Sequence, residues 1–270
     1  MPAGRRRRAD RSFQGRGMNL ETVFGLRGRT ALVTGSSRGI GAAIAEGLAG
    51  AGARVILHGT SEAGTKAVRA RIEAAGGVAD ELACDLAVPE AGRRLIRQAE
   101  ALAPVDILVI NASAQINASL ADLTAADLSF QLAVNLGSTV DMLQTVLPLM
   151  AARGWGRVVS VGSVNQLRPK GIVSAYAATK AAQHNLIQSQ ARDYAQNNVL
   201  LNTLAPGLID TDRNAGRRDN DPEGWAQYTR SLNWMGRAGQ PSEMVGAAIF
   251  LASDACSFMT GEAIFLTGGY

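Results

Sequence analysis

The sequence predicts an α/β fold, in which one domain is built on a doubly wound parallel sheet. Short apolar runs alternate with longer helical segments along nearly the whole chain, and Gly-rich or polar turns separate them. The chain has 270 residues, of which 47% are apolar and 19% charged. This is an ordinary composition for one globular domain of that size, and no linker or repeat divides the chain.

Seven apolar runs have the length of strands, and helical segments follow most of them. Strands are expected at 30–33, 54–57, 78–83, 106–110, 157–161, 199–204 and 263–266. Helices are expected at 40–51, 62–75, 89–102, 124–153 (as one helix or as two with a break in the middle), 174–197 and 241–252. The stretch 210–239 is polar with little apolar periodicity, and we interpret it as a substrate lid.

Composition excludes several classes of protein. No run of about 18 apolar residues exists, so no membrane span is expected. Cys84 and Cys256 are too few for a disulfide framework and fit a reducing, cytoplasmic compartment. Neither cysteine has a histidine beside it in the sequence or a C-x-x-C spacing. Both are therefore expected to be packing residues rather than nucleophiles.

The excess of positive charge lies at the start of the chain. Residues 1–17 hold six arginines and one aspartate, whereas the whole chain carries only +4. The run Arg5 to Arg8 is compatible with nucleic-acid or membrane-surface binding. A disordered basic tail, with Met18 as the true start, is the interpretation that we favour. We thus expect the catalytic domain at 18–270 and no nucleic-acid or membrane partner; without an apolar segment, the tail is not a signal peptide.

A glycine-rich turn follows the first expected strand. It reads Thr34-Gly35-Ser36-Ser37-Arg38-Gly39-Ile40-Gly41, with the spacing G-x-x-x-G-x-G. Such glycines let the backbone approach a pyrophosphate at the N-terminus of a helix. Alone, the pattern also fits a tight strand-to-helix turn, but its place in a βαβ unit favours a Rossmann-type dinucleotide site.

This turn resembles the T-G-x-x-x-G-x-G fingerprint of the short-chain dehydrogenase/reductase family. The likeness extends from about Leu26 to the C-terminus and is closest to the bacterial 3-oxoacyl-(acyl-carrier-protein) reductases. It implies that Asp85, followed by Leu86, contacts the adenine, although Asp85 is equally typical of a helix N-cap. The segment Asn111-Ala112-Ser113 matches the family's N-A-G with Ser113 in place of glycine, so a small shift of this loop is expected.

The choice of nicotinamide depends on the turn after the second strand. Enzymes that use NAD usually place a carboxylate there, on the ribose 2′-hydroxyl. Here the turn holds Gly59, Thr60 and Ser61, and no acid precedes Glu62. Arg38 in the glycine loop suits a 2′-phosphate. Together these residues predict NADP as the cofactor.

The catalytic motif is Y-x-x-x-K, from Tyr176 to Lys180. Residues four apart share one face of a helix, and a nearby cation is expected to lower the pKa of the phenol from about 10. The resemblance implies that Ser163, thirteen positions earlier, binds the substrate oxygen and that Asn135 holds a water beside Lys180. Each residue alone also fits a structural role, but their ordered set is specific.

The resemblance completes the cofactor site with the segment after the sixth strand. Near Pro206-Gly207, the main chain at Ile209 and the hydroxyl of Thr211 are expected to contact the carboxamide. The expected cofactor-binding set is therefore Gly35, Ser37, Arg38, Gly39, Ile40, Gly41, Gly59, Thr60, Ser61, Asp85, Leu86, Asn111, Ala112, Ser113, Tyr176, Lys180, Pro206, Gly207, Ile209 and Thr211. No metal site is expected.

These residues predict reduction of a carbonyl to a secondary alcohol, with Tyr176 as the proton donor. A 3-oxoacyl thioester is the first expected substrate, and a sugar or polyol is the alternative. A cofactor-bound regulator without turnover is a third hypothesis, against which the intact Tyr176 and Lys180 argue. Residues expected around the substrate are Gln115, Gln166, Arg168 and the lid at 210–239, in which Trp225, Tyr228 and Trp234 either face the substrate or anchor the lid.

The resemblance also implies a homotetramer of dihedral symmetry. Helices 124–153 and 174–197 would pair in one interface, and the last helix and strand would form the other. Met142, Val146, Leu149 and Met150 follow helical spacing and make an apolar stripe. Such a stripe serves equally as core or as interface.

Overall fold

The computed structural model describes residues 19–269, so the tail predicted at 1–17 lies outside the described residues. Seven parallel strands form one sheet in the order β3-β2-β1-β4-β5-β6-β7. The predicted doubly wound α/β fold is confirmed. The strands are β1 (Thr30–Val33), β2 (Arg54–Gly59), β3 (Val78–Ala83), β4 (Ile107–Ile110), β5 (Gly156–Val161), β6 (Val199–Pro206) and β7 (Ala263–Leu266).

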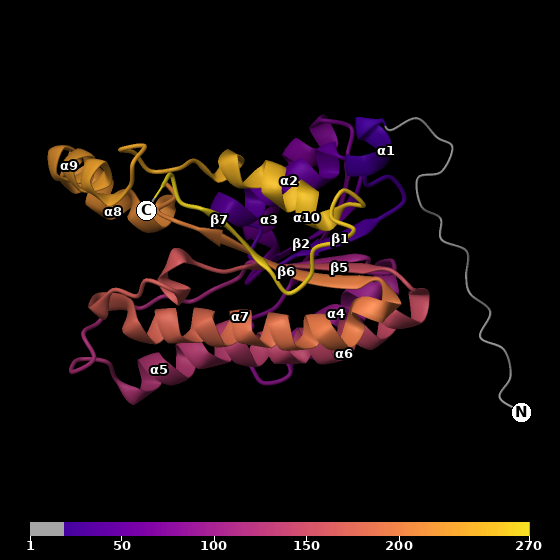
Figure 1. Ribbon diagram of the computed structural model, residues 1–270, viewed down its shortest axis with the longest axis horizontal. Helices are drawn as coiled ribbons and strands as arrows, with labels where there is room; N and C mark the ends of the chain where they lie inside the picture. Colours follow the sequence, from indigo (N-terminus) through magenta and orange to yellow (C-terminus); the bar gives the residue numbers. More distant parts are fainter. Residues whose placement is uncertain (1–18, 270) are drawn as a thin grey trace, which may run out of the picture.

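Helices cover both faces of the sheet (Figure 1). On one face lie α2 (Gly39–Gly50), α3 (Glu62–Ala74) and α10 (Val245–Ala252), with the short α1 (Leu20–Phe24) beside them. On the other face lie α4 (Ala91–Leu102), α5 (Ala125–Leu132), α6 (Ser138–Arg153) and α7 (Ser174–Tyr194). The three layers separate the hydrophobic core into two halves.

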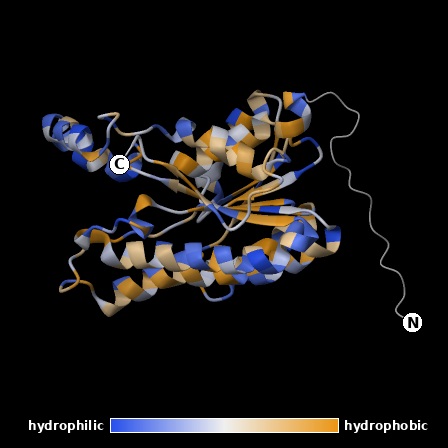
Figure 2. Cartoon of the chain, viewed as in Figure 1, coloured by the Kyte–Doolittle hydropathy of each residue, from blue (hydrophilic) through white to orange (hydrophobic). Residues whose placement is uncertain are grey.

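The two halves follow from the alternation of side chains along a strand. In β1, Ala31 and Val33 pack with α2 and α10, whereas Leu32 faces the half formed with α4, α6 and α7. All three side chains are fully buried. In Figure 2 the strands at the centre are accordingly the most hydrophobic part of the chain. Strands that are buried on both faces consist of nearly continuous apolar runs, and this pattern made it possible to predict them from the sequence.

The long helix expected at 124–153 is interrupted in its middle. Thr124 begins α5 with a capping box, in which its hydroxyl accepts from the Asp127 N–H. Residues Ala133–Gly137 form one turn of π-helix before α6 continues to Arg153. Such turns are rare and frequently occur at functional sites. Here the turn contains Asn135.

Two helices lie where the sequence showed only a polar stretch. They are α8 (Asp212–Asn220) and α9 (Pro222–Leu232), which project beyond the carboxyl ends of the strands (Figure 1). Helix α8 has no buried residue, so no apolar periodicity marks it. For α9 a signal exists: Asp221 accepts from the Gly224 N–H and Pro222 occupies the first turn.

The strand β2 also extends to Gly59, beyond the predicted residue 57.

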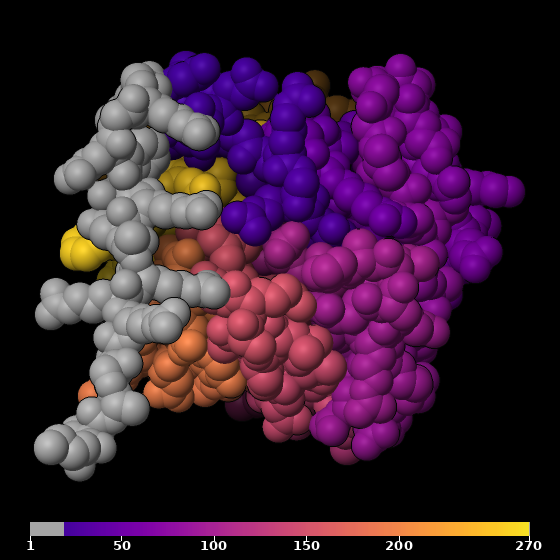
Figure 3. All heavy atoms as spheres, turned by 90° about the vertical axis from the view of Figure 1, so that its right-hand side faces the viewer, coloured from indigo at the N-terminus to yellow at the C-terminus, as the bar shows by residue number. Residues whose placement is uncertain are grey.

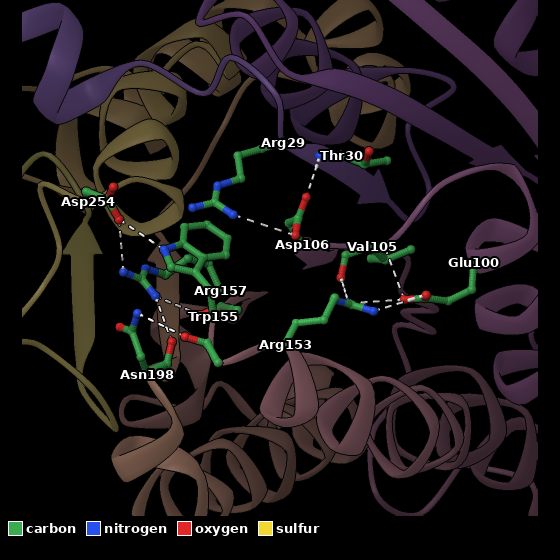
Figure 4. A network of polar contacts seen from close by, with 12 residues as sticks. Arg29, Thr30, Glu100, Val105, Asp106, Arg153, Trp155, Arg157, Asn198 and Asp254 are labelled. Carbon is green, nitrogen blue, oxygen red and sulfur yellow. Dashed lines mark hydrogen bonds and ion pairs between the residues drawn. The ribbon is translucent and has the colours of Figure 1, made fainter. Parts of the chain in front are cut away.

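The opposite edge of the sheet, where the strands begin, is closed by a polar network (Figure 4). The fully buried Arg157 of β5 donates to the backbone oxygens of Ser253, Gly156 and Asn198, and contacts Asp254 at 3.5 Å. Its guanidinium also lies 4.4 Å from the centre of the Trp155 ring. Figure 3 shows this side of the molecule, where the early and middle parts of the chain pack side by side. Among residues 19–269 no helix is long and apolar enough to cross a bilayer.

Candidate active site

A cleft of about 830 Å³ lies at the carboxyl ends of the strands. Its floor lies at β1, between β2 and β4. From β1 the chain first adds β2 and β3 on one side of the sheet and then β4 to β7 on the other side. Ligands of doubly wound sheets bind in this crevice. Of the predicted site residues, all but Ser61 and Asn135 line the cleft. Ser61 is the N-cap of α3, and Asn135 is fully buried behind the wall.

The glycine loop needs its glycines for two measurable reasons. Gly35 has φ of +62°, and a Cβ there would lie 2.9 Å from the Cα of Ala112. A Cβ on Gly41 would lie 2.3 Å from the carbonyl oxygen of Gly35. The loop therefore packs against its neighbours through bare backbone, and the N-terminus of the twelve-residue helix α2 opens into the cleft. This cradle fits a dinucleotide pyrophosphate.

Thr34 and Asn111 fasten the glycine loop to the loop after β4. The Asn111 side-chain amide donates to the backbone oxygens of Thr34 (2.9 Å) and Gly35 (3.0 Å). In return, the Thr34 hydroxyl oxygen accepts from the backbone N–H of Asn111 (2.9 Å) and of Ala112 (3.1 Å). The two loops that would hold the cofactor are thus one rigid unit.

His58, one residue beyond the strand predicted at 54–57, supports the same loop from below. It is buried in β2, and its Nδ1 accepts from the Gly35 N–H at 3.2 Å. Its Nε2 lies 3.1 Å from the Cys84 carbonyl oxygen and 3.3 Å from the Cys84 Sγ. His58 and Cys84 are thus neighbours in space although they are 26 positions apart in the sequence. Burial lowers the pKa of His58 and raises that of the Cys84 thiol, which disfavours a thiolate.

The end of the cleft at which the adenosine is expected contains Asp85 and Arg38. The Asp85 carboxylate accepts from the Ala87 N–H at 2.9 Å, and the N-cap of α4 is Glu90. The alternative that Asp85 caps this helix is therefore wrong. Arg38 precedes α2 and forms an ion pair of 3.7 Å with Asp212 of α8. Gly59 and Thr60 line the cleft, and no carboxylate stands between them and Glu62 at the start of α3.

Tyr176, Ser163 and Lys180 meet at the centre of the cleft. Tyr176 is 6% exposed, and a hydrogen bond joins its side chain to Ser163. The Lys180 Nζ lies 6.0 Å from the centre of the tyrosine ring. It donates to the Val161 carbonyl oxygen at 2.7 Å and to the Gln183 side-chain oxygen at 3.0 Å. Gln183 lies one helical turn after Lys180, and the sequence reasoning missed it.

The electrostatics of this pair differ from the expectation. Burial raises the pKa of Tyr176, and the charge of Arg213 and the bond with Ser163 offset this only in part. The predicted lowering by Lys180 is therefore wrong for the chain by itself. Burial, assisted by the charge of Arg213, lowers the pKa of Lys180 to about 7. A lysine that is half neutral near pH 7 offers a neighbouring phenol less positive charge.

Asn135 lies behind Tyr176, in the π-turn. Its side-chain nitrogen donates to the Ala114 carbonyl oxygen (2.8 Å) and the Thr179 hydroxyl (2.9 Å), and its side-chain oxygen accepts from the Ala114 N–H (2.8 Å). The backbone oxygen of Asn135 accepts from Gln183 at 3.1 Å. Asn135 thus reaches Lys180 through Gln183, and it fixes the loop after β4. Its expected role in holding a water stays a prediction.

The far end of the cleft combines polar side chains with apolar ones such as Phe130, Ile172 and Leu232. Gln115, Trp225 and Tyr228 line it as expected, whereas Gln166, Arg168 and Trp234 are not among its lining residues. Gln166 instead accepts from the Ser163 N–H at 3.3 Å, and Trp234 is 85% exposed. The lining of this end also includes residues that the sequence did not single out: Asn117, Asn165, Lys170, Arg213, Asn214 and Arg217.

Comparison with known proteins agrees with this geometry. The family model described as "Enoyl-(Acyl carrier protein) reductase" matches residues 35–270. A solved 3-oxoacyl (acyl-carrier-protein) reductase from Agrobacterium tumefaciens C58 with NADP bound is 76% identical, with a TM-score of 0.94; the match covers 96% of this chain and 100% of that one. The chain belongs to the short-chain dehydrogenase/reductase family.

Sugar-acid dehydrogenases of this family are also similar to the chain. The gluconate 5-dehydrogenase of Gluconobacter oxydans (strain 621H) is 34% identical over 253 residues, 93% of this chain and 98% of the relative. A solved gluconate 5-dehydrogenase from Burkholderia cenocepacia J2315, in complex with NADP and tartrate, is 35% identical with a TM-score of 0.86, covering 93% of this chain and 98% of that one.

Membership in the short-chain dehydrogenase/reductase family makes this chain an oxidoreductase of alcohols and ketones. Its cleft has a dinucleotide half, formed by the glycine loop and the loop after β4, and a substrate half beyond Tyr176. Within the described part of the chain, no group of three His, Cys, Asp or Glu side chains gathers in a way that would hold a metal ion. At the centre of the cleft the chain brings together the side chains of Tyr176, Ser163 and Lys180.

Proposed function

We propose that this protein interconverts a ketone and a secondary alcohol in a polyhydroxylated, sugar-like substrate, with NADP as its cofactor. The observation that carries this proposal is the polar lining of the substrate half, where Gln115, Asn117, Asn165 and Asn214 supply side-chain amides. Gln115, Asn117 and Asn214 already make hydrogen bonds within the protein. The Asn165 side-chain oxygen is buried and has no hydrogen-bond partner within residues 19–269. A substrate rich in hydroxyl groups satisfies this oxygen, whereas an acyl chain leaves it unpaired at a cost.

The cofactor site fits NADP. The bare backbone of Gly35 and Gly41 leaves room for the pyrophosphate, and Arg38 offers an exposed cation where the 2′-phosphate of the adenosine is expected. No acid at Gly59 or Thr60 opposes that phosphate. When bound, NADPH supplies the hydride that reaches the carbonyl carbon, and NADP⁺ accepts it in the reverse direction.

Tyr176 acts as the general acid in reduction. Its raised pKa keeps the phenol protonated, so it holds the proton that the forming alkoxide needs. Ser163, joined to the same hydroxyl, donates a hydrogen bond to the substrate oxygen and polarises the carbonyl. In oxidation the same atoms act in reverse, and Tyr176 takes the proton from the alcohol.

Lys180 and Asn135 return the proton to Tyr176. The Lys180 ammonium, with a pKa of about 7, is poised to exchange protons near neutrality. Gln183 holds its Nζ, and Asn135 in turn holds Gln183 through its backbone oxygen. In this proposal Lys180 also binds the nicotinamide ribose, and Asn135 keeps a water within reach of Lys180.

A 3-oxoacyl thioester is the second candidate substrate. It is favoured by the name of the relative that is 76% identical. The side-chain amides of the substrate half predict that a thioester reacts slowly. The discriminating experiment is a steady-state assay with both nicotinamides on ketoses and ketoaldonates against acetoacetyl thioesters. The proposal fails if only the thioester is reduced at an appreciable rate.

We further propose a homotetramer in the cytoplasm, with α8 and α9 as a lid that closes over the substrate. Exposed apolar side chains on the α5–α6 face and in β7 support the assembly: Leu128, Phe130, Leu132, Leu149 and Phe265 are each about two fifths exposed. Burial of such a patch against a second copy is favourable. Light scattering at micromolar concentration tests it, and a stable monomer contradicts it. The free thiols of Cys84 and Cys256 fit a reducing compartment.

A further inference from the structure

Arg213 crosses the substrate half of the cleft without meeting a carboxylate. From the first turn of α8, its guanidinium donates to the Gln115 side-chain oxygen at 3.1 Å and to the Ser113 hydroxyl and carbonyl oxygens at 3.3 Å each. A hydrogen bond with the Tyr176 side chain completes its contacts. All of these acceptors are formally neutral groups. They orient the guanidinium, which is exposed to solvent, and none of them carries a negative charge.

Other arginines of the same region have carboxylate partners. Arg38 pairs with Asp212 at 3.7 Å, Arg218 pairs with Asp210 and Asp219, and Arg237 pairs with Glu243 at 2.7 Å. Arg213 makes no such ion pair within residues 19–269. The carboxylates of this region therefore pair with other arginines, and none of them forms an ion pair with Arg213.

Two further cations stand beside Arg213 in the cleft. The Lys170 Nζ donates to the Tyr228 hydroxyl at 3.0 Å, and the Arg217 guanidinium lies 3.7 Å from the centre of the same ring. The only acids among the lining residues are Asp85, at the adenosine end, and Asp212, which is paired with Arg38. The substrate half therefore holds three cations and no acid of its own.

We propose that Arg213 binds a carboxylate of the substrate, so that the physiological substrate is a hydroxy acid or keto acid of the sugar-acid class. This inference rests on the proposed function and narrows it. A planar guanidinium matches a carboxylate through two parallel hydrogen bonds. Lys170 and Arg217 add positive charge at the entrance of the same half.

The position of Arg213 favours a carboxylate over the phosphate of a long prosthetic arm. Its contact with Tyr176 places the guanidinium next to the hydroxyl that exchanges the proton. The anion must therefore lie on the same short carbon skeleton as the reacting carbon. A phosphate at the far end of an acyl-carrier arm is many bonds away from the 3-oxo group and does not reach this point.

The charge of Arg213 also acts on the catalytic groups. It lowers the pKa of both Tyr176 and Lys180. A substrate carboxylate that pairs with Arg213 offsets this charge, whereas burial, the larger cause of the lowered Lys180 pKa, remains. A variant of Arg213 thus affects chemistry as well as binding, and the test must separate the two effects.

The test compares aldonates, such as gluconate, with their primary amides, which differ only in the charge at one carbon. Wild-type enzyme with NADP⁺ should prefer the acid in kcat/KM. Arg213→Gln should lower kcat/KM for the acid by about 10- to 100-fold, mainly through KM, because a charge-assisted pair is lost. The amide should change less than about threefold, and Arg213→Lys should fall between. The matched control is Arg230→Gln, which removes the same charge from α9 outside the cleft lining.

Tartrate binding to the NADPH-loaded enzyme, followed by calorimetry, gives a second readout without turnover. We expect tartrate to bind wild type and Arg230→Gln alike and Arg213→Gln at least about tenfold more weakly, with unfolding temperatures and NADPH affinity unchanged. An equal loss on acid and amide, an unaffected tartrate affinity, or tighter binding of inorganic phosphate than of tartrate would overturn the inference. Turnover of polyols and amides as fast as aldonates would also sink it while leaving the proposed function intact; reduction of thioesters alone would instead refute the proposed function.

Discussion

Within residues 19–269, two cations are almost completely buried, one at each edge of the sheet, and they differ in their partners. Arg157 at the start of β5 and Lys180 of α7 are each 1% exposed. Arg157 has three backbone oxygens, the Trp155 ring and the carboxylate of Asp254. Lys180 has one backbone oxygen and one amide oxygen, at the end of the same strand.

The partners decide whether the buried charge is permanent. Burial lowers the pKa of Arg157 to about 10, with Asp254 opposing the shift, so the guanidinium stays charged at every physiological pH. Burial lowers the pKa of Lys180 to about 7, and no carboxylate opposes it. A permanent charge thus lies at the start of β5, and a titratable charge lies beside its end. The comparison predicts that changes near Lys180 cost activity, whereas changes at Arg157 cost stability.

The largest effect is expected from Tyr176→Phe. Removal of the proton donor should lower kcat by at least about 1,000-fold, since general acid catalysis contributes at this scale. The unfolding temperature should change by only a few degrees, and NADPH affinity should remain nearly that of wild type. We expect an activity assay to show almost no turnover, while a fluorescence titration shows that NADPH still binds. Wild-type turnover in this variant would refute the mechanism.

At the other edge, Arg157→Met should destabilise the fold by about 3 kcal/mol. It leaves three backbone oxygens without their donor and Asp254 without its cation; since Asp254 is half exposed, the cost lies at the low end for a broken buried pair. This corresponds to roughly 8 °C in unfolding temperature for a domain of this size. The folded variant should keep wild-type kcat.

Arg29→Met is the matched control for Arg157. Arg29 lies 3.7 Å from the centre of the same Trp155 ring, but a third of its side chain is exposed. Its loss should cost about 1 kcal/mol or less, as for other exposed ion pairs. Equal destabilisation by the two variants would mean that burial of the charge is not what matters at this edge.

The sequence predicted the active-site edge better than the opposite edge. The glycine loop, Tyr176 and Lys180 belong to short contiguous motifs whose residues meet within one turn or one helix. Arg157, by contrast, looks like an ordinary first residue of a strand, and its partners Asn198 and Asp254 are 41 and 97 positions away. Contacts of this kind depend on the packing of distant segments, which no local pattern encodes.

The same reasoning explains what was missed inside the site. Arg213 lies in a helix without a buried residue, so neither periodicity nor hydropathy marked it. The contact of His58 with Cys84 joins the ends of two neighbouring strands, which the register of the sheet brings together. Only Gln183, three residues after Lys180 on the same helix, could have been found from spacing alone.

A third prediction extends the comparison to an exposed cation. Arg38→Ala removes a side chain that is 76% exposed at the adenosine end of the cleft. The variant should bind NADPH about tenfold more weakly than the wild type does, because NADPH carries the 2′-phosphate. It should bind NADH about as tightly as the wild type does, because NADH lacks that phosphate. Thermal stability should not change, since exposed ion pairs contribute little. Tighter binding of NADH than NADPH by the wild-type enzyme would show that the cofactor preference is wrong.

The pH dependence of stability tests the two buried cations directly. The pKa of Lys180 falls from 10.5 in the unfolded chain to about 7 in the folded one. Below about pH 7 both states carry the charge, and the folded protein bears the full cost of burying it. As pH rises from about 7 towards 10.5, only the unfolded chain still binds the proton, so this cost disappears progressively.

Lys180→Met removes the titration and should therefore be more stable than wild type at pH 6.5. The difference should close by roughly 8 °C towards pH 9.5, because each pH unit between the two pKa values is worth about 1.4 kcal/mol. The gap between wild type and Arg157→Met should stay constant over the same range, because Arg157 remains protonated in the folded state until about pH 10. Unfolding temperatures of the three proteins, measured at half-unit steps of pH, make the comparison. A constant gap for Lys180→Met would show that the lysine is charged throughout, and that its two oxygen partners stabilise the ammonium as fully as Asp254 and the backbone stabilise Arg157.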